Sequence, residues 1–390
     1  MTLTPQSQRL HIVLAGNRNS GKSSLLNAVA GQQASIVSET PGTTTDQVRK
    51  VMEIQGLGPC VLIDTAGIDD EGELGQKRIQ ASIDALKSAD IVLAVISAAD
   101  HAFPRLPRTA APVLPVISKA DLCGDSDLES FSKEVEEKFG RKATVTSVTE
   151  RKGITALLQA IRESIPEDWD APMLTSGLLD EGELAVLVMP QDRQAPKGRL
   201  ILPQQQTIRE LLDRKCRIAC CDIDTLQATL NSLNETPKAI IADSQIIGKV
   251  QDLKPEGTAL TSFSILLAAA KGDMDYFREG AKALDSLTPG SRVLIAEACT
   301  HVPASEDIGR VQIPRLLRSR AGDGLKIDIV SGRDFPEDLS GYDLIIHCGA
   351  CMFNRRYVMA RVEQAKAQGV PMTNYGVAIA HITGAPTQSK

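Results

Sequence analysis

The chain has 390 residues, of which 42% are hydrophobic and 24% charged, and a formal net charge of −6. This length favours two or three domains, and the negative charge excludes a general attraction to nucleic acid or to an anionic membrane. No apolar run reaches the roughly 18–20 residues that a membrane span needs, and the N-terminus lacks the pattern of a signal peptide. We therefore expect a cytoplasmic protein that binds neither nucleic acid nor membrane.

The first segment alternates strand-like and helical stretches. HIVLA at 11–15 is typical of a buried strand, and CVLID, DIVLAVIS and PVLPVIS are further strands, with the helical stretch KRIQASIDALKSA among them. Strands separated by helices predict a mostly parallel sheet covered on both faces. The helix GITALLQAIRESI and the proline- and acid-rich stretch at 166–172 end this segment. We place the first domain at residues 1–168.

A glycine-rich turn follows the first strand. Its sequence, GNRNSGKS at 16–23, fits the pattern G-x-x-x-x-G-K-S/T, in which backbone N–H groups wrap phosphates. We expect Lys22 to reach the β- and γ-phosphates and the Ser23 hydroxyl to bind Mg²⁺. The predicted nucleotide contacts of this turn are Gly16, Asn17, Asn19, Ser20, Gly21, Lys22, Ser23 and Ser24.

Two later motifs predict the rest of the magnesium and γ-phosphate site. PGTTTD at 41–46 offers Thr44 to complete the Mg²⁺ shell and sense the γ-phosphate. DTAG at 64–67 ends a strand, so Asp64 would bind Mg²⁺ through water and the Gly67 N–H would meet the γ-phosphate. The predicted catalytic residues are Lys22, Thr44 and Gly67.

The base-binding motif is SKAD at 118–121, also at a strand end. Asp121 would accept hydrogen bonds from guanine, Lys119 would pack along the base, and Ser147 in SVTERKG would supply a last contact. Each motif alone is weak evidence, but four in this order and at strand ends strongly indicate a GTP-binding domain that uses Mg²⁺.

Two more α/β segments follow, which makes three α/β domains in all. In residues 175–262, ELAVLVMP, RIACCDI and KAIIADS are predicted strands, and TIRELLDRK, TLQATLNSL and SQIIGKVQDL predicted helices. Residues 263–390 open on one long helical stretch, SILLAAAKGDMDYFREGAKALDSL, before the strands RVLIAEA, KIDIVSG and YDLIIHC. Free cysteine is usually buried, so we expect Cys216, Cys220 and Cys221 in a core. The basic stretch FNRRYVMAR is interpreted as a solvated helix start.

Potential metal ligands follow two of the last strands. Cys299 and His301 follow one, and His347, Cys348 and Cys351 accompany the other. Loops at the carboxyl ends of parallel strands can converge on one crevice. Four closed ligands would suit zinc, whereas three thiolates would suit a 4Fe–4S cluster with one iron lacking a cysteine, and spacing does not separate the two. His301, His347 and Glu297 are the candidates for a fourth ligand.

Two other interpretations of Cys348 and Cys351 stay open at this point. The two cysteines of a lone CxxC motif are often core residues without a chemical role. They can also form a redox dithiol, which in this chain would be controlled by GTP. Either interpretation leaves Cys299 and both histidines unused.

The first segment resembles the translation-factor-like GTPases, and most closely the potassium-dependent tRNA-modification GTPases. The resemblance implies that Asn19 coordinates K⁺. Ile68 follows DTAG where Ras-like proteins have a catalytic glutamine, so hydrolysis should be slow unless a cation assists. Ser118 stands where the NKxD motif has asparagine, which should weaken nucleotide binding.

The whole chain resembles the FeFe-hydrogenase maturation GTPases. The resemblance rests on the four GTPase motifs in front, a middle segment without motifs, and CTH at 299–301 with HCGAC at 347–351 behind. It implies a GTPase domain, a dimerisation domain at 175–262 and a cluster-binding domain at 263–390. It also implies a 4Fe–4S cluster on Cys299, Cys348 and Cys351.

The same resemblance implies a homodimer that acts as a scaffold and carrier, with GTP as a switch for partner exchange. Its cargo would be the diiron H-cluster precursor, made with two radical-SAM maturases and delivered to apo-FeFe-hydrogenase. The alternative is an RNA-modification or ribosome-assembly GTPase with a structural zinc site, which the net charge of −6 disfavours.

Overall fold

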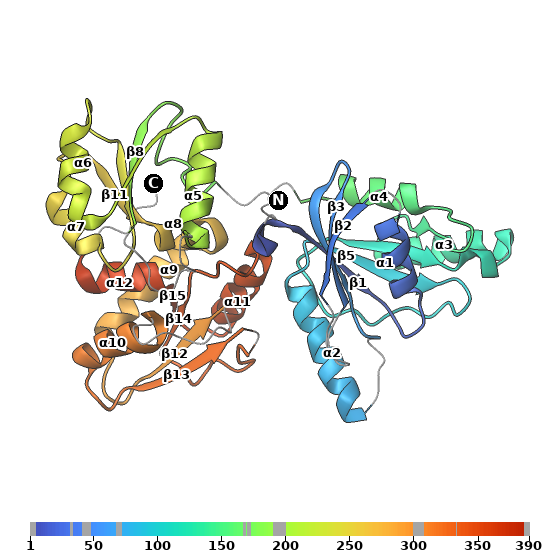
Figure 1. The fold of residues 1–390 in the computed structure, drawn as a ribbon. Helices are drawn as coiled ribbons and strands as arrows, with labels where there is room; N and C mark the ends of the chain where they lie inside the picture. Colours follow the sequence, from blue (N-terminus) through green and yellow to red (C-terminus); the bar gives the residue numbers. More distant parts are fainter. Residues whose placement is uncertain are drawn as a thin grey trace. The chain divides into compact units, whose positions relative to one another are not determined.

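The computed structural model describes residues 5–31, 34–40, 48–67, 72–166, 169, 173–189, 200–298, 308–332 and 334–385. The chain forms two compact units, Met1–Asp170 and Ala171–Lys390 (Figure 1). The first contains one sheet and the second contains two.

The first unit is built on a seven-stranded sheet of order β2-β3-β4-β1-β5-β6-β7. Only the pairs β2–β3 and β3–β4 are antiparallel. The mostly parallel sheet is therefore confirmed, and the exception is a hairpin at one edge. The strands are β1 (Leu10–Ala15), β2 (Ala34–Thr40), β3 (Val48–Ile54), β4 (Gly58–Asp64), β5 (Ile91–Ser97), β6 (Val113–Ser118) and β7 (Thr144–Val145).

Helices cover both faces of this sheet. Alternate residues of β1 belong to two different hydrophobic cores, one on each face. Leu10, Ile12 and Leu14 pack with residues of α1 and α4, whereas Val13 and Ala15 pack with residues of α2. A strand buried on both sides explains the consecutive apolar residues at 12–15. The helices of the unit are η1 (Gln6–Gln8), α1 (Lys22–Gly31), α2 (Gly72–Lys87), η2 (Ala120–Leu122), α3 (Asp125–Phe139) and α4 (Ile154–Glu163).

The second unit contains two four-stranded parallel sheets, of order β11-β10-β8-β9 and β13-β12-β14-β15. Their strands are β8 (Leu184–Val188), β9 (Arg217–Cys221), β10 (Ala239–Ala242), β11 (Ala259–Ser262), β12 (Arg292–Glu297), β13 (Lys326–Ser331), β14 (Leu344–His347) and β15 (Met372–Asn374). The helices that connect the strands of the first of these sheets are α5 (Leu202–Asp213), η3 (Ile223–Thr225), α6 (Leu226–Ser232) and α7 (Ile247–Leu253), and α8 (Phe263–Lys271) follows its last strand. Those after α8 are α9 (Met274–Ala281), η4 (Lys282–Ser286), the π-helix η5 (Ile308–Gln312), α10 (Ile313–Ala321), α11 (Arg355–Ala367) and α12 (Tyr375–Thr383).

The prediction of one long helical stretch from residue 264 onward is wrong in its continuity. The structure has three separate helices there, α8, α9 and η4. A Cβ on Gly272 would lie 2.2 Å from the Phe277 ring, so the break requires a glycine. Asp273 then caps α9 by accepting a hydrogen bond from the Tyr276 N–H at 3.0 Å.

Two other sequence expectations are corrected. Cys216 is buried as predicted, but Cys220 is exposed and Cys221 is only partly buried, because β9 lies at an edge of its sheet. The stretch FNRRYVMAR is not simply a solvated helix start, since Arg361 is only 3% exposed.

Candidate functional site

The turn between β1 and α1 has the shape that a phosphate loop needs. A Cβ on Gly16 would lie 2.3 Å from the Val95 carbonyl oxygen, so this position admits no side chain. Asn19 and Gly21 have φ of 60° and 90°, in the left-handed region. The turn delivers Ser23 and Ser24 to the exposed first turn of α1.

Lys22 lies inside the curve of this turn. It is 7% exposed, and its Nζ donates to the carbonyl oxygens of Gly16 at 3.0 Å and Asn17 at 2.7 Å. The Asn17 amide in turn donates to the Ala102 carbonyl at 3.2 Å. The ammonium therefore lies where an anionic phosphate chain would be received.

The predicted magnesium ligands Ser23 and Asp64 are in direct contact. The parallel pairing of β1 with β4 places Leu14 beside Asp64, and the Ser23 hydroxyl donates to Asp64 Oδ2 at 2.5 Å. Burial raises the pKa of Asp64, while the Ser23 hydrogen bond and the Lys22 charge oppose that rise. Within the described residues, the buried Asp64 Oδ1 has no hydrogen-bond partner. A hydroxyl beside a carboxylate with an unsatisfied oxygen is a donor set that fits Mg²⁺ and its water shell.

Of the two other residues predicted at the γ-phosphate, the structure describes Gly67 but not Thr44. Gly67 is buried and lies three residues after Asp64. The segment between them is held in place by Thr65, whose hydroxyl donates to the Leu14 carbonyl at 2.8 Å. Thr44 and Ile68 lie outside the described residues.

The predicted base-binding residues come together. The Ser147 hydroxyl donates to Asp121 Oδ1 at 2.6 Å and the Thr149 hydroxyl to Oδ2 at 3.3 Å. These bonds, Ser147 first, lower the pKa of Asp121 and keep the carboxylate charged for an N–H donor. Lys119 precedes Asp121 with φ of 55°, which turns the chain sharply at the end of β6.

Ser118 has a role that the sequence did not reveal. Its hydroxyl is 3% exposed and lies 2.5 Å from the Ser20 carbonyl and 3.2 Å from that of Ile96. This contact joins the base loop to the phosphate loop. Its only sequence signal is its position directly before Lys119 and Asp121.

The second site lies where β12 and β14 end side by side. The register pairs Ala296 with His347, so Cys348 emerges next to the segment that continues toward residue 299. Cys348 Sγ accepts hydrogen bonds from the backbone N–H of Ala298 at 3.0 Å and of Ala350 at 3.3 Å. Burial raises the pKa of Cys348 to about 11, and these two N–H groups oppose the rise.

Two of the three predicted thiol ligands are described there. Cys348 and Cys351 are each partly exposed, whereas Cys299 and His301 lie outside the described residues. The sulfur of Cys348 nevertheless contacts the backbone of residue 298, the immediate neighbour of Cys299. Among the residues that the structure describes, no three His, Cys, Asp or Glu side chains are grouped as a metal site.

The candidate fourth ligand His347 has a hydrogen-bond partner at each ring nitrogen. It is fully buried, its Nδ1 donates to the Cys348 carbonyl at 2.7 Å, and its Nε2 accepts from Arg361 at 2.9 Å. Burial, together with the Arg361 charge, lowers the pKa of His347 to about 3, so the ring is neutral. In this conformation His347 supports the loop, and a metal would have to displace one of these two partners.

Glu297 is likewise occupied. Its Oε2 accepts two hydrogen bonds from Arg310, each of 3.0 Å, and one from the Ser331 hydroxyl at 3.2 Å. The side chain is only 12% exposed. The carboxylate is thus held in a partly buried ion pair, which Glu297 would have to give up to act as a fourth ligand.

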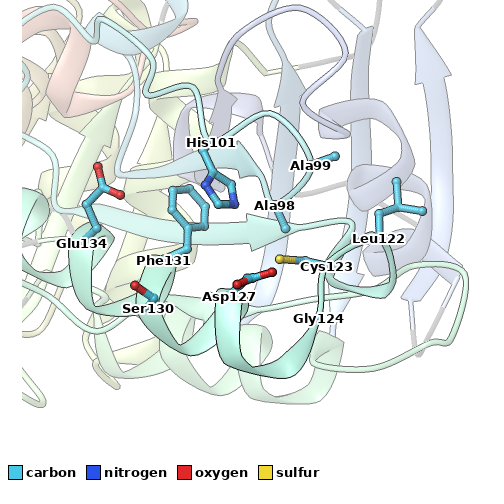
Figure 2. Close-up of a pocket in the computed structure, with 10 residues that line it drawn as sticks. All are labelled: Ala98, Ala99, His101, Leu122, Cys123, Gly124, Asp127, Ser130, Phe131 and Glu134. Carbon is cyan, nitrogen blue, oxygen red and sulfur yellow. The ribbon is translucent and has the colours of Figure 1, made fainter.

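A separate hollow of about 360 Å³ lies beside α3 in the first unit. Figure 2 shows His101 over Phe131 in its wall, and their rings stack 4.0 Å apart. None of the predicted nucleotide-binding residues lines it.

Comparison with protein families gives three matches along the chain. Residues 174–272 match the hydrogen maturase F dimerization domain and residues 275–389 match the hydrogen maturase F tetramerization domain. Together these matches span more than half of the chain. The chain belongs to the hydrogen maturase F family. Residues 11–122 match the 50S ribosome-binding GTPase family, so this hydrogen maturase F chain carries a GTPase domain, which supports GTP and Mg²⁺ as its ligands.

Curated relatives resemble the first unit. GTPase Era of Thermosipho melanesiensis is 33% identical over 166 residues, 40% of this chain and 55% of that protein. The tRNA modification GTPase MnmE of Nitrosomonas eutropha is 36% identical over 164 residues, again 40% of this chain but 35% of that protein. The chain thus spans about half or less of the length of these relatives.

Solved structures resemble the chain more distantly. A variant of Era from Aquifex aeolicus, bound to GDP.AlF4-, is 20% identical with a TM-score of 0.33, covering 57% of this chain and 98% of that one. The G domain of the T. maritima FeoB iron transporter is 21% identical with a TM-score of 0.30, covering 40% and 99%. In the described part of the chain, no helix is both long and apolar enough to cross a membrane.

Proposed function

We propose that this hydrogen maturase F protein is a cytoplasmic, GTP-hydrolysing scaffold that binds a 4Fe–4S cluster. It would receive the diiron precursor of the H-cluster from two radical-SAM maturases and deliver it to apo-FeFe-hydrogenase. The observation that carries the proposal is the thiol of Cys348, which accepts two backbone N–H groups directly beside the segment leading to Cys299.

The donor set at the ends of β12 and β14 fits a cluster. Cys299, Cys348 and Cys351 would hold it, and N–H groups that point at Cys348 Sγ favour the thiolate that a metal ligand must be. A cluster held by three cysteines would offer one iron at which a further group can be exchanged. With His347 and Glu297 occupied, His301 is the remaining protein candidate for the fourth position.

The GTPase domain would act as the switch. Lys22 would neutralise the phosphates, Ser23, Thr44 and Asp64 would hold Mg²⁺, and the Gly67 N–H would meet the γ-phosphate. Asp121 would recognise guanine, with Lys119 and Ser147 beside it. Loss of the γ-phosphate typically reorders the loops that contact it, which would time partner exchange.

Cluster binding is tested by anaerobic reconstitution. The wild-type chain should hold about four iron and four sulfide atoms. Cys348→Ser should lose both and keep its GTP turnover, whereas Cys220→Ser, at an exposed edge-strand position, should keep the cluster. Full loading of Cys348→Ser, or stoichiometric zinc without sulfide in the wild type, would contradict the proposal.

A role for K⁺ is tested separately. If Asn19 coordinates K⁺ and the cation assists hydrolysis in place of a catalytic glutamine, GTP turnover should be faster in K⁺ than in Na⁺. Asn19→Ala should remove that difference. Equal wild-type rates in the two salts would refute the role assigned to Asn19 without affecting the cluster.

A further inference from the structure

Lys271 is a buried lysine directed at the loop that carries the two cysteines. It is 6% exposed. Its Nζ donates to the carbonyl oxygens of Ala350 at 2.7 Å, Phe353 at 2.8 Å and Cys351 at 3.4 Å. One ammonium thus binds three carbonyls across residues 350–353, and one of these belongs to a predicted ligand.

The loop needs such support because its backbone is unusual. Ala350 has φ of 50°, in the region that residues with a Cβ rarely occupy. The same residue donates its N–H to Cys348 Sγ and gives its carbonyl to Lys271. The contact with Lys271 therefore stabilises the conformation that aims an N–H group at the Cys348 sulfur.

Lys271 comes from a helix shared by the two sheets of the second unit. Phe263 and Leu266, near the start of α8, lie in the core of the first sheet, whereas Ala268, one turn before Lys271, lies in the core of the second. Helix α8 packs against α5 on one side and against α11 and α12 on the other (Figure 1). The positive charge of Lys271 thus comes from the last residue of a helix that belongs to the dimerization match at 174–272.

Positive charge at this place has an electrostatic consequence for an anionic cluster. Arg361, 3% exposed, approaches the same loop through His347, so two buried cations flank it. Coulomb interactions are strong at buried sites, and the net charge around an iron–sulfur cluster helps to set its reduction potential. A cation favours the reduced state, because that state carries one more negative charge.

We propose that Lys271 is a positioning residue for the cluster, which holds the Cys348–Cys351 loop in its ligand conformation and raises the reduction potential of the bound cluster. The inference rests on the proposed function, since it requires a cluster on this loop. It adds a determinant that lies outside the cysteine motifs and outside the tetramerization match at 275–389.

The test uses the full-length chain, purified and reconstituted anaerobically, with three substitutions of Lys271. Lys271→Met removes charge and donors, Lys271→Gln keeps donors without charge, and Lys271→Arg keeps both. Lys254→Met is the matched control, because Lys254 also donates to a carbonyl, that of Thr258 at 3.1 Å, but at the C-terminal end of α7. Two quantities are measured: the rate of iron loss to an excess of ferrous chelator, and the midpoint potential of the one-electron couple by EPR-monitored dithionite titration.

Lys271→Met should lose iron about 10- to 100-fold faster, because loss of an outer-shell partner of a metal ligand typically lowers metal affinity by that factor. Its midpoint potential should fall below the wild-type value. Lys271→Gln should lose iron at nearly the wild-type rate but share the lowered potential, and Lys271→Arg and Lys254→Met should match the wild type. If Lys271→Met does not fold, the comparison of Lys271→Gln with Lys271→Arg isolates the charge.

A loaded wild type with unchanged potentials in Lys271→Met and Lys271→Gln would overturn this inference and leave the proposed function standing. A wild type that takes up no iron and sulfide would overturn the proposed function, and this inference with it.

Discussion

At the scale of single residues, the most informative contacts join positions far apart in the sequence. Ser118 contacts a carbonyl 98 residues away, and Lys271 contacts one 79 residues away. The phosphate loop itself was predictable, because its chemistry lies within eight consecutive residues. Ser118 and Lys271 were not, since no periodicity or local motif records which distant backbone a side chain will meet.

Ser118→Ala should weaken nucleotide binding, although serine already replaces the usual asparagine. The substitution removes the hydroxyl that links the base loop to Ser20, and one such hydrogen bond contributes about 0.5–1.5 kcal/mol, or roughly 2- to 12-fold in affinity. Isothermal titration with GDP measures the effect. Ser132→Ala is the control, because Ser132 only bonds the Leu128 carbonyl within α3. Equal affinities of the two variants would show that the link does not contribute.

The thiol of Cys60 should be much less reactive than that of Cys220. Burial, and then the charge of Glu53, raises its pKa from 9.0 to about 12. At pH 7.5 iodoacetamide should label the exposed Cys220 and spare Cys60 until the domain unfolds, as peptide mass mapping would show. Because the folded thiol keeps its proton between pH 9 and 12 while the unfolded one loses it, stability should fall as pH rises through that window. Labelling of both thiols at the same rate would contradict the assigned burial.

At the scale of elements, segments with a clear apolar or amphipathic pattern were predictable, and some short strands without one were not. The predicted strand HIVLA corresponds to β1, and GITALLQAIRESI to α4, because each carries a clear pattern. The short strands β7, β11 and β15 have two to four residues and take their conformation from neighbouring strands. The break between α8 and α9 depends on Phe277 filling the space beside Gly272, which only the fold reveals.

Helix α9 packs so closely against β15 that adding a methyl group at Gly280 should push the two elements apart. A Cβ on Gly280 would lie 2.1 Å from the Met372 carbonyl oxygen, and such overpacking costs about 1–3 kcal/mol. Gly280→Ala should therefore lower the thermal midpoint of the full-length chain, followed by circular dichroism.

The matched control for that substitution is Gly248→Ala in α7. An added Cβ there meets nothing within 4 Å, so the change should be neutral or stabilising by up to about 1 kcal/mol. A Gly280→Ala midpoint equal to that of Gly248→Ala would show that the two elements can move apart at little cost.

At the scale of the whole molecule, the family borders and the physical units differ. The dimerization and tetramerization matches divide at 272–275, yet Ala171–Lys390 is one compact unit. The reason is α8, which contributes residues to the cores of both sheets. The boundary that we predicted at 262–263 assigns α8 to the last domain, and the family match assigns it to the middle one; each describes half of its packing.

A fragment of residues 173–390 should fold cooperatively, whereas one of 275–390 should not. The shorter fragment lacks Ala268 from its core and Lys271 from its cysteine loop, which leaves three carbonyls without their shared donor. Calorimetry and the dispersion of amide NMR signals distinguish the two cases. A folded 275–390 fragment would mean that α8 only rests on that domain.

The sharing of α8 also sets an order of events during synthesis. Lys271 leaves the ribosome 79 residues before Ala350, its nearest partner, and at elongation rates of about 5–20 residues per second that interval lasts roughly 4–16 s. During this time β14 and the cysteine loop do not yet exist beside β12. If this loop binds the proposed cluster, loading can begin only after Cys351 has been translated, because two of the three proposed ligands lie at residues 348 and 351 of the chain.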